Sequence, residues 1–302
     1  VGERAVADLT SSLGNSAPDT LDAERALAWA RYDASESRES LATIPELAER
    51  CRRSLGPEHL TTLSVERLRG ILLRMSGDRA GEVALAERGL ELARTHYPAD
   101  RRLIAVMTDD LASALVRAGE DDRAIELQRE ALALATEELG DRHPHAMVIT
   151  SNLASFLTGS GGAAEALDLL ETLLARRGET LGPDHPSTLG TESLIGDVLG
   201  DLGRFDQAIP HYRRAIDGYR ASIGEGHPRT LAARLNLGIA HYRSTDCATA
   251  VELLESLVDD ATEHLGPTNL LTLDGMQGLA AACECAGDPR RAKELNEIVL
   301  AK

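Results

Sequence analysis

Apolar residues in this chain recur at spacings of three and four, which is the period of an amphipathic helix. In the stretch from 144 to 160, Ile149, Leu153 and Leu157 share one helical face, and the stretch from 120 to 140 behaves in the same way. Val, Ile and Thr form no alternating runs, so strands are not expected. The pattern predicts an all-α protein built from pairs of helices.

A nine-residue segment marks the joint before each pair of helices. It reads LGPDHPSTL at residue 181 and LGPEHLTTL at residue 55, and related segments begin at 139, 223 and 265. The starts from 139 onward are 42 residues apart, and degenerate copies at 13 and 97 keep the same phase. A fixed period of this length predicts stacked copies of one structural unit, because a single helix pair cannot bury its apolar face alone. The predicted units start near residues 13, 55, 97, 139, 181, 223 and 265.

Three columns of small residues keep the phase of the repeat. The first column lies inside the first helix of each unit and reads Ala28, Gly70, Ala112, Ala154, Gly196, Gly238 and Ala280. The second lies at the bend between the helices and reads Ser35, Gly77, Gly119, Gly161, Gly203, Thr245 and Gly287. The third lies early in the second helix and reads Ser40, Glu82, Ala124, Ala166, Ala208, Ala250 and Ala292. Glycine at a bend supplies a positive-φ residue, and small residues inside helices let the pair approach closely.

This arrangement resembles the tetratricopeptide repeat, a two-helix unit with small residues at these three places. The usual unit has about 34 residues, and the 42-residue unit with its LGxxHPxTL joint is similar to the kinesin light chain type. The resemblance covers essentially the whole chain and implies a right-handed α-solenoid of about seven stacked antiparallel helix pairs. HEAT-like repeats share the length range, but they explain neither the glycine column nor the His-Pro joint.

Some segments depart from the regular pattern. Pro45 and Pro210 fall inside predicted second helices and predict a bend in each. The first unit reads ASESRES, from 34 to 40, where later units have glycine at the bend. Residues 1–12 match the end of a preceding second helix, and the chain has no initiator methionine, so we expect a segment of a longer protein with 1–302 forming one repeat domain.

Charge and composition narrow the classes of function. The chain has 302 residues, a formal net charge of -17 and a sequence pI near 5.0, which disfavours binding to nucleic acid and to anionic membranes. No apolar run approaches the roughly 18 residues of a membrane span, and no signal peptide is visible. Four cysteines are too few for a disulfide scaffold of this size, so we expect a reduced, cytoplasmic protein. The preference for arginine over lysine suggests a bacterial source.

None of the segments that could carry chemistry has a convincing catalytic or metal-binding pattern. Equivalent residues in successive repeats lie roughly 10 Å apart, so the histidines of the joints cannot converge on one metal ion. TGSGGAAEA, from 158 to 166, lacks the Lys-Ser/Thr of a phosphate loop and falls on the bend column. Cys283 and Cys285 do not have CxxC spacing, and Cys283 falls in a leucine column, which predicts a core position. We therefore expect no cofactor, no metal and no enzymatic activity.

The resemblance also implies where a ligand would bind. In tetratricopeptide arrays the first helices line a concave groove, and the contact positions surround the small residue of each first helix. Carried onto this sequence, those positions nominate Arg25, Trp29, Tyr32, Arg67, Arg74, Asp109, Asp110, Asn152, Ser155, Asp197, Asn236, Tyr242 and Arg243.

The chemistry of these positions changes along the chain. Arginines and aromatic rings in the first third suit an acidic or aromatic peptide or a terminal carboxylate. Acidic and amide side chains in the middle suit backbone amides or a basic segment. The Lys-Asn carboxylate clamp of chaperone-binding members is absent.

The preferred interpretation is a non-catalytic scaffold that binds a peptide or protein segment in this groove. In a second interpretation, the array is a ligand-sensing or autoinhibitory module of a larger bacterial signalling ATPase or transcription regulator and packs against other domains of its own chain. A third, an enzyme built in the groove, would require titratable side chains that converge in one pocket.

Overall fold

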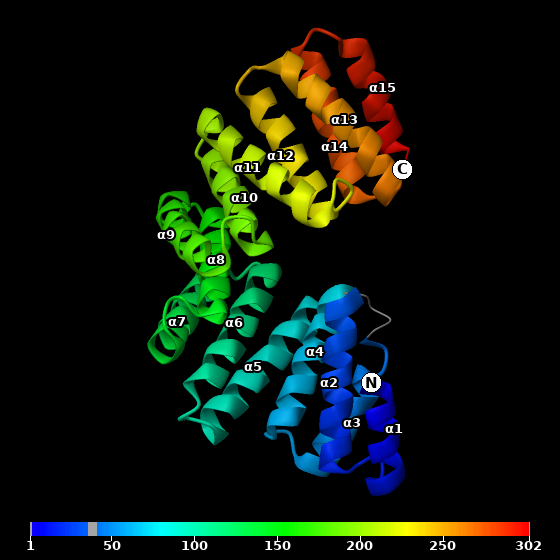
Figure 1. Ribbon diagram of the computed structural model, residues 1–302, viewed down its shortest axis with the longest axis vertical. Coiled ribbons are helices and arrows are strands. Elements are labelled where there is room, and N and C mark those ends of the chain that lie inside the picture. Colours follow the sequence, from blue (N-terminus) through cyan, green and yellow to red (C-terminus); the bar gives the residue numbers. More distant parts are fainter. Residues whose placement is uncertain (1, 36–40, 302) are drawn as a thin grey trace. The chain divides into compact units, whose positions relative to one another are not determined.

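The computed structural model describes residues 2–35 and 41–301, and all regular secondary structure in those residues is helical (Figure 1). Two kinds of helix alternate along the chain, so the all-α prediction is confirmed. The first helices of the units are α2 (Pro18–Ser35), α4 (Leu60–Ser76), α6 (Arg101–Ala118), α8 (Pro144–Gly159), α10 (Pro186–Asp201), α12 (Pro228–Arg243) and α14 (Leu270–Cys285). The second helices are α1 (Gly2–Leu13), α3 (Ile44–Leu55), α5 (Arg79–His96), α7 (Asp121–Leu139), α9 (Ala163–Leu181), α11 (Phe205–Ile223), α13 (Cys247–Leu265) and α15 (Pro289–Leu300).

The chain folds into two compact units that divide between Ile149 and Thr150, inside α8. Helices α1 to α7 belong to the first unit, and α9 to α15 belong to the second. The assignment of residues 1–302 to one repeat domain stays a prediction, as does the right-handed sense of the superhelix.

The histidines of the repeated joint start the first helices of the units. The Nδ1 atoms of His59, His185 and His227 each accept a hydrogen bond from the backbone N–H two residues later, over 3.1 to 3.2 Å. His143 makes the same contact, and Asn269 replaces the imidazole with its Oδ1 in the last joint. A cap of this kind satisfies one of the helix N–H groups that have no partner within the helix. The joint is therefore a helix start, as the sequence indicated.

The bend column has the predicted backbone conformation. Gly77, Gly119, Gly161 and Gly203 have φ values between 72° and 88°, in the left-handed region that favours glycine. At Thr245 a β-branched residue takes the same conformation, with φ of 68°. A β-branched side chain is strained there, so this bend stores a small conformational cost that the others avoid.

Small residues allow close approach inside the helix pairs. A Cβ atom added at Gly196 would lie 2.6 Å from the ring of Tyr212, and one added at Gly238 would lie 2.6 Å from the side chain of Leu254. The alanines of the third column, from Ala124 to Ala292, are completely buried. The predicted role of both columns in helix packing is confirmed.

The two prolines of the predicted second helices lie in different parts of their helices. Pro210 lies inside α11 as expected, but the prediction for Pro45 is wrong, since α3 begins at Ile44 and the proline occupies its first turn. A proline is tolerated there because its missing N–H would have no intrahelical partner. Most of ASESRES, residues 36–40, lies outside the described residues.

The cysteines are not all reduced. Cys247 and Cys285 form a disulfide with their Cα atoms 5.7 Å apart, so the expectation of free thiols is wrong for this pair. Cys51 and Cys283 are free and buried, which confirms the core position of Cys283. Within the described residues, no helix is both long enough and apolar enough for a membrane crossing.

Candidate binding groove

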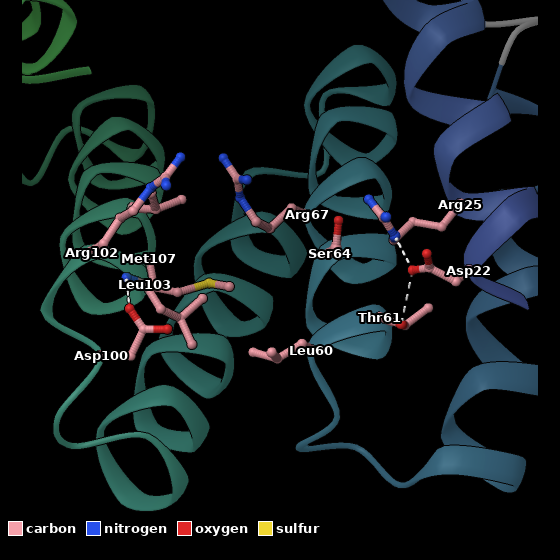
Figure 2. A pocket seen from close by; sticks show the side chains of 11 residues that line it. Asp22, Arg25, Leu60, Thr61, Ser64, Arg67, Asp100, Arg102, Leu103 and Met107 are labelled. Atoms are coloured by element: carbon pink, nitrogen blue, oxygen red, sulfur yellow. Dashed lines mark hydrogen bonds and ion pairs between the residues drawn. The ribbon is translucent and has the colours of Figure 1, made fainter. Parts of the chain in front are cut away.

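Two adjoining cavities in the first unit contain most of the predicted arginine and aromatic residues. One has a volume of about 340 Å³ and lies among α2, α4, α5 and α6; its lining includes Trp29, Tyr32, Arg67, Arg74 and Asp110. The other has a volume of about 390 Å³ and shares Arg67 with the first (Figure 2). We call these two cavities together the first groove.

Trp29 and Tyr32 form the aromatic wall of the first groove. They are three residues apart on α2 and so share a face of that helix, with ring centroids 6.5 Å apart in an edge-to-face arrangement. The indole N–H of Trp29 donates to the Ser64 hydroxyl over 3.0 Å. Both rings are half-buried, so each leaves part of its surface open to a ligand.

Arg67 lies at the centre of the first groove and already has a partner. Its guanidinium donates two hydrogen bonds to Asp110, over 2.5 and 3.2 Å, and lies 5.5 Å from the centroid of the Trp29 ring. Burial alone would lower the pKa of Arg67, but the charges of Asp110 and Asp109 raise it above its ordinary value. Arg67 therefore organises the groove and has little free charge for a ligand.

The remaining arginines differ in how fully they are neutralised. Arg25 pairs with Asp22 over 2.8 Å, and this hydrogen bond lowers the pKa of Asp22 although burial opposes the shift. Arg74 donates a hydrogen bond to the Tyr32 hydroxyl over 3.2 Å. Among the described residues, Arg74 and Arg102 have no carboxylate partner, so they are the cations that the first groove offers to a ligand (Figure 2 shows Arg102).

Asp109 is half-buried and contacts the second helix of its own pair. Its carboxylate accepts a hydrogen bond of 2.6 Å from the amide of Gln128, and this amide also bonds the Ile149 carbonyl over 3.2 Å. Gln128 is fully buried on α7. Burial of the nearby His145 imidazole lowers its pKa. Asp109 is thus tied to the packing of α6 against α7.

In the second unit a cavity of about 320 Å³ collects Asp197, Asn236 and Arg243. The Asp197 carboxylate accepts hydrogen bonds of 2.8 Å from the Tyr212 hydroxyl and from the Asn236 amide. Burial raises the pKa of Asp197, although both hydrogen bonds act in the opposite direction. The Arg243 guanidinium lies 5.5 Å from the centroid of the Phe205 ring.

Three further predicted positions are placed differently. Tyr242 packs against the buried cluster formed by α12 to α15, and the Ser155 hydroxyl donates to the Ser151 carbonyl in its own helix over 3.1 Å. Asn152 is half-buried on α8. Within the described residues, no group of three or more His, Cys, Asp and Glu side chains could hold a metal ion.

Comparison with known families agrees with this architecture. Sequence models of the tetratricopeptide repeat match residues 104–145, 145–221 and 187–263, which together make up more than half of the chain. This chain belongs to the tetratricopeptide repeat family. No curated protein sequence matches it.

Solved structures show the same kind of repeat. The array of nearly identical TPR-like repeats from a Podosopora anserina kinesin light chain-type protein has 27% sequence identity and a TM-score of 0.59, and covers 67% of this chain and 94% of its own. BtubC (BKLC) from P. vanneervenii has 23% identity and a TM-score of 0.63, and covers 74% and 90%. A Rap protein in complex with competence and sporulation factor has 12% identity and a TM-score of 0.65, and covers 94% and 85%. The tetratricopeptide array is thus of the kinesin light chain type, and its fold is that of protein-interaction scaffolds.

Two residues of this tetratricopeptide groove, Glu82 and Arg102, were not predicted as site residues. Glu82 breaks the alanine column and is 6% exposed, with its carboxylate held by Arg117 over 2.6 and 3.2 Å. The break in the column was the available signal. Arg102 lies in the first turn of α6, outside the contact columns, and no pattern in the sequence marked it.

Proposed function

We propose that the first groove binds an extended, acidic segment of a protein partner. The observation that carries this proposal is the combination of a half-exposed aromatic wall, Trp29 and Tyr32, with two arginines that have no carboxylate partner among the described residues. Arginine forms strong, charge-assisted hydrogen bonds with carboxylates, and exposed aromatic surface contributes contact area at a low entropic cost. The rest of the chain is strongly acidic, so such a segment would be repelled elsewhere.

The spacing of the two arginines limits the length of the segment. Arg102 occupies the column of Leu60 in the preceding unit, and Arg74 stands fourteen residues after Leu60 on α4. At about 1.5 Å per helical residue, the two cations lie roughly 20 Å apart along the helices, which about six extended residues span. The preferred ligand therefore carries a carboxylate at each end of a stretch of about six residues, with an apolar or aromatic residue between them.

Synthetic peptides test this proposal. A hexapeptide with terminal glutamates and a central leucine is titrated against the protein, and binding is followed by the fluorescence of Trp29, the single tryptophan. We expect binding that weakens with salt, and an R74A/R102A variant that loses at least about tenfold in affinity. The control variant, R94A/R123A, removes the same charge from exposed positions on α5 and α7. Equal binding of a glutamine-substituted peptide, or equal losses in the two variants, would contradict the proposal.

Packing of the groove against other domains of the same chain is the competing interpretation. The Rap structure holds a separate factor, and its likeness to this chain extends to the fold alone. If a longer natural form of the protein binds the peptide no more weakly than residues 1–302 do, no other domain occupies the groove. If the longer form binds it much more weakly, the groove acts within the chain.

A further inference from the structure

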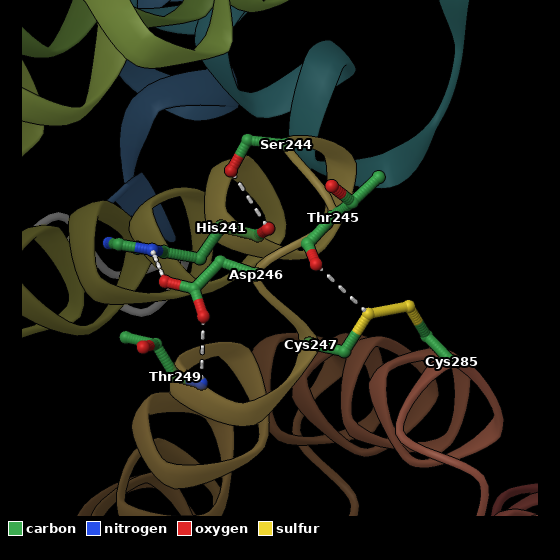
Figure 3. Close-up of a disulfide and its surroundings, with 7 residues drawn as sticks. All are labelled: His241, Ser244, Thr245, Asp246, Cys247, Thr249 and Cys285. Atoms are coloured by element: carbon green, nitrogen blue, oxygen red, sulfur yellow. Dashed lines mark hydrogen bonds and ion pairs between the residues drawn. A yellow bond between two sulfur atoms is a disulfide. The ribbon is translucent and has the colours of Figure 1, made fainter.

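The disulfide lies in the second compact unit and joins two successive repeats of the array. Cys247 is the first residue of α13, Cys285 is the last residue of α14, and their Cα atoms lie 5.7 Å apart (Figure 3). This separation falls within the usual range for disulfides. The bond therefore ties the bend of one helix pair, between α12 and α13, to the bend of the next pair, between α14 and α15.

The two equivalent positions one repeat earlier are also in contact with each other. Phe205 stands 42 residues before Cys247, and Arg243 stands 42 residues before Cys285. The Arg243 guanidinium lies 5.5 Å from the centroid of the Phe205 ring, and both side chains line the cavity of the second unit. Cys285 thus occupies a groove-lining column, in which a covalent bond replaces a cation–π contact.

The two bonded cysteines are the accessible ones. Cys285 is exposed and Cys247 is half-buried, whereas Cys51 and Cys283 are at most 1% exposed. Burial raises the pKa of the Cys51 thiol to about 11 and also raises that of Cys283, so neither forms a thiolate readily. A thiol from solution can reach the Cys285 sulfur, while the other two cysteines stay inert.

Exchange at Cys285 has a suitable leaving group. When a thiolate attacks the Cys285 sulfur, the bond between the two cysteines breaks and Cys247 leaves as a thiolate at the N-terminus of α13. Unpaired N–H groups and the positive end of the helix dipole stabilise a thiolate there. The neighbouring Asp246 opposes this, but its carboxylate is directed toward the Thr249 N–H, at 3.4 Å, and the His241 ring, at 3.0 Å (Figure 3).

We propose that Cys247 and Cys285 form a reversible redox site that a small thiol or a protein dithiol reduces. A second thiolate attacks the mixed disulfide and releases Cys285, so two thiols are oxidised to one disulfide and each cysteine gains one electron and one proton. The bonded Cys247 sulfur lies 3.5 Å from the Thr245 carbonyl, which can accept a hydrogen bond from the thiol once the disulfide is reduced and the sulfur is protonated. In the oxidised form the bends of the last two repeats are held together, and in the reduced form they are free to separate.

The end of the array is the part that such a bond would control. Ala292 is the buried side chain of α15, and Leu300 remains 87% exposed. Reduction should therefore loosen α14 and α15 and leave the first unit unchanged.

Thiol labelling of the purified protein tests the chemistry. The protein is equilibrated in mixtures of reduced and oxidised glutathione, quenched with a maleimide under native conditions, and mapped by mass spectrometry. We expect labels on Cys247 and Cys285 together, increasing with the reduced fraction, and none on Cys51 or Cys283. Labelling of the pair in every mixture, or in none up to millimolar reduced glutathione, would overturn the redox site.

Hydrogen exchange tests the structural consequence. Reduction of the wild type, or the C247S/C285S substitution, is expected to lower amide protection in α14 and α15 by about tenfold or more, with no change in α2 to α6. C283S, a matched change at the free cysteine on the same helix, keeps the disulfide and should retain its response to reduction. Equal protection in the oxidised and reduced forms would overturn the role of the bond in holding the end of the array.

Discussion

The buried ion pair of Glu82 and Arg117 leads to the sharpest stability prediction for this protein. Glu82 stands where five other units have a completely buried alanine, and its side chain is 8% exposed against 34% for Arg117. We consider R117M, which removes the guanidinium but keeps most of the apolar stem, and E82A, which restores the alanine of the column. Removing one partner of a buried pair should cost more than removing both, because a lone buried charge loses its compensation.

The size of the effect follows from the two hydrogen bonds. Each hydrogen bond to a charged group contributes about 1.5–3 kcal/mol in a buried setting, and water reaches this pair through the partly exposed arginine. We therefore expect R117M to lower the free energy of unfolding of the first unit by about 2 kcal/mol. The double variant E82A/R117M should lose less than about 1 kcal/mol, because alanine fits this position in the other units.

Urea unfolding followed by Trp29 fluorescence measures this difference, since the single tryptophan lies in the same unit as the pair. R123M is the matched control: it removes one arginine from exposed ion pairs with Glu87 and Glu120 and should cost less than about 0.5 kcal/mol. The reasoning is refuted if E82A/R117M is less stable than R117M, or if R117M and R123M unfold at the same urea concentration.

Three other sets of variants probe the small-residue columns, the helix caps and the cavity of the second compact unit. G238A should destabilise by about 1–3 kcal/mol because its Cβ would lie 2.6 Å from a buried leucine, whereas G70A, whose nearest side-chain atom is 4.0 Å away, should be tolerated; thermal unfolding that affects both equally would contradict this. H185A should lose about 1 kcal/mol with its cap, and H185N should restore it because Asn269 caps the last unit in the same way; failure of the rescue in thermal melts would exclude a capping role. D197N should stabilise the second unit at neutral pH, since burial raises the pKa of Asp197 and so penalises its charged form. Because the pKa is raised, the folded wild type becomes protonated above pH 3.8, so that advantage should shrink as the pH falls toward 3.8 and be absent below it; urea melts showing an advantage independent of pH would rule out this cause.

Most of the fold was determined by local sequence. The 42-residue period, the His-Pro joint and the glycine at the bend each act within a few residues, through a cap, a first helical turn or a positive φ, so their effect can be predicted without the rest of the chain. The small-residue columns predicted where helices approach, because packing leaves no room for a larger side chain at Gly196 or Gly238. Pro45 was misplaced because its helix begins at Ile44, later in its repeat than α5 and α7 begin in theirs, so the proline falls in a first turn.

The chemistry of the groove was decided by tertiary structure. The repeat indicated that Arg67 and Asp110 occupy groove columns, but only the folded chain brings them within hydrogen-bond distance, which neutralises Arg67 and leaves Arg74 and Arg102 as the available cations. The same holds for Cys247 and Cys285, whose separation of 38 residues matches no motif and becomes a contact only when successive bends stack. The period of the sequence specifies which positions face each other in successive repeats. Which side chains pair there depends on the residue that each repeat has at those positions and on the conformations that packing permits.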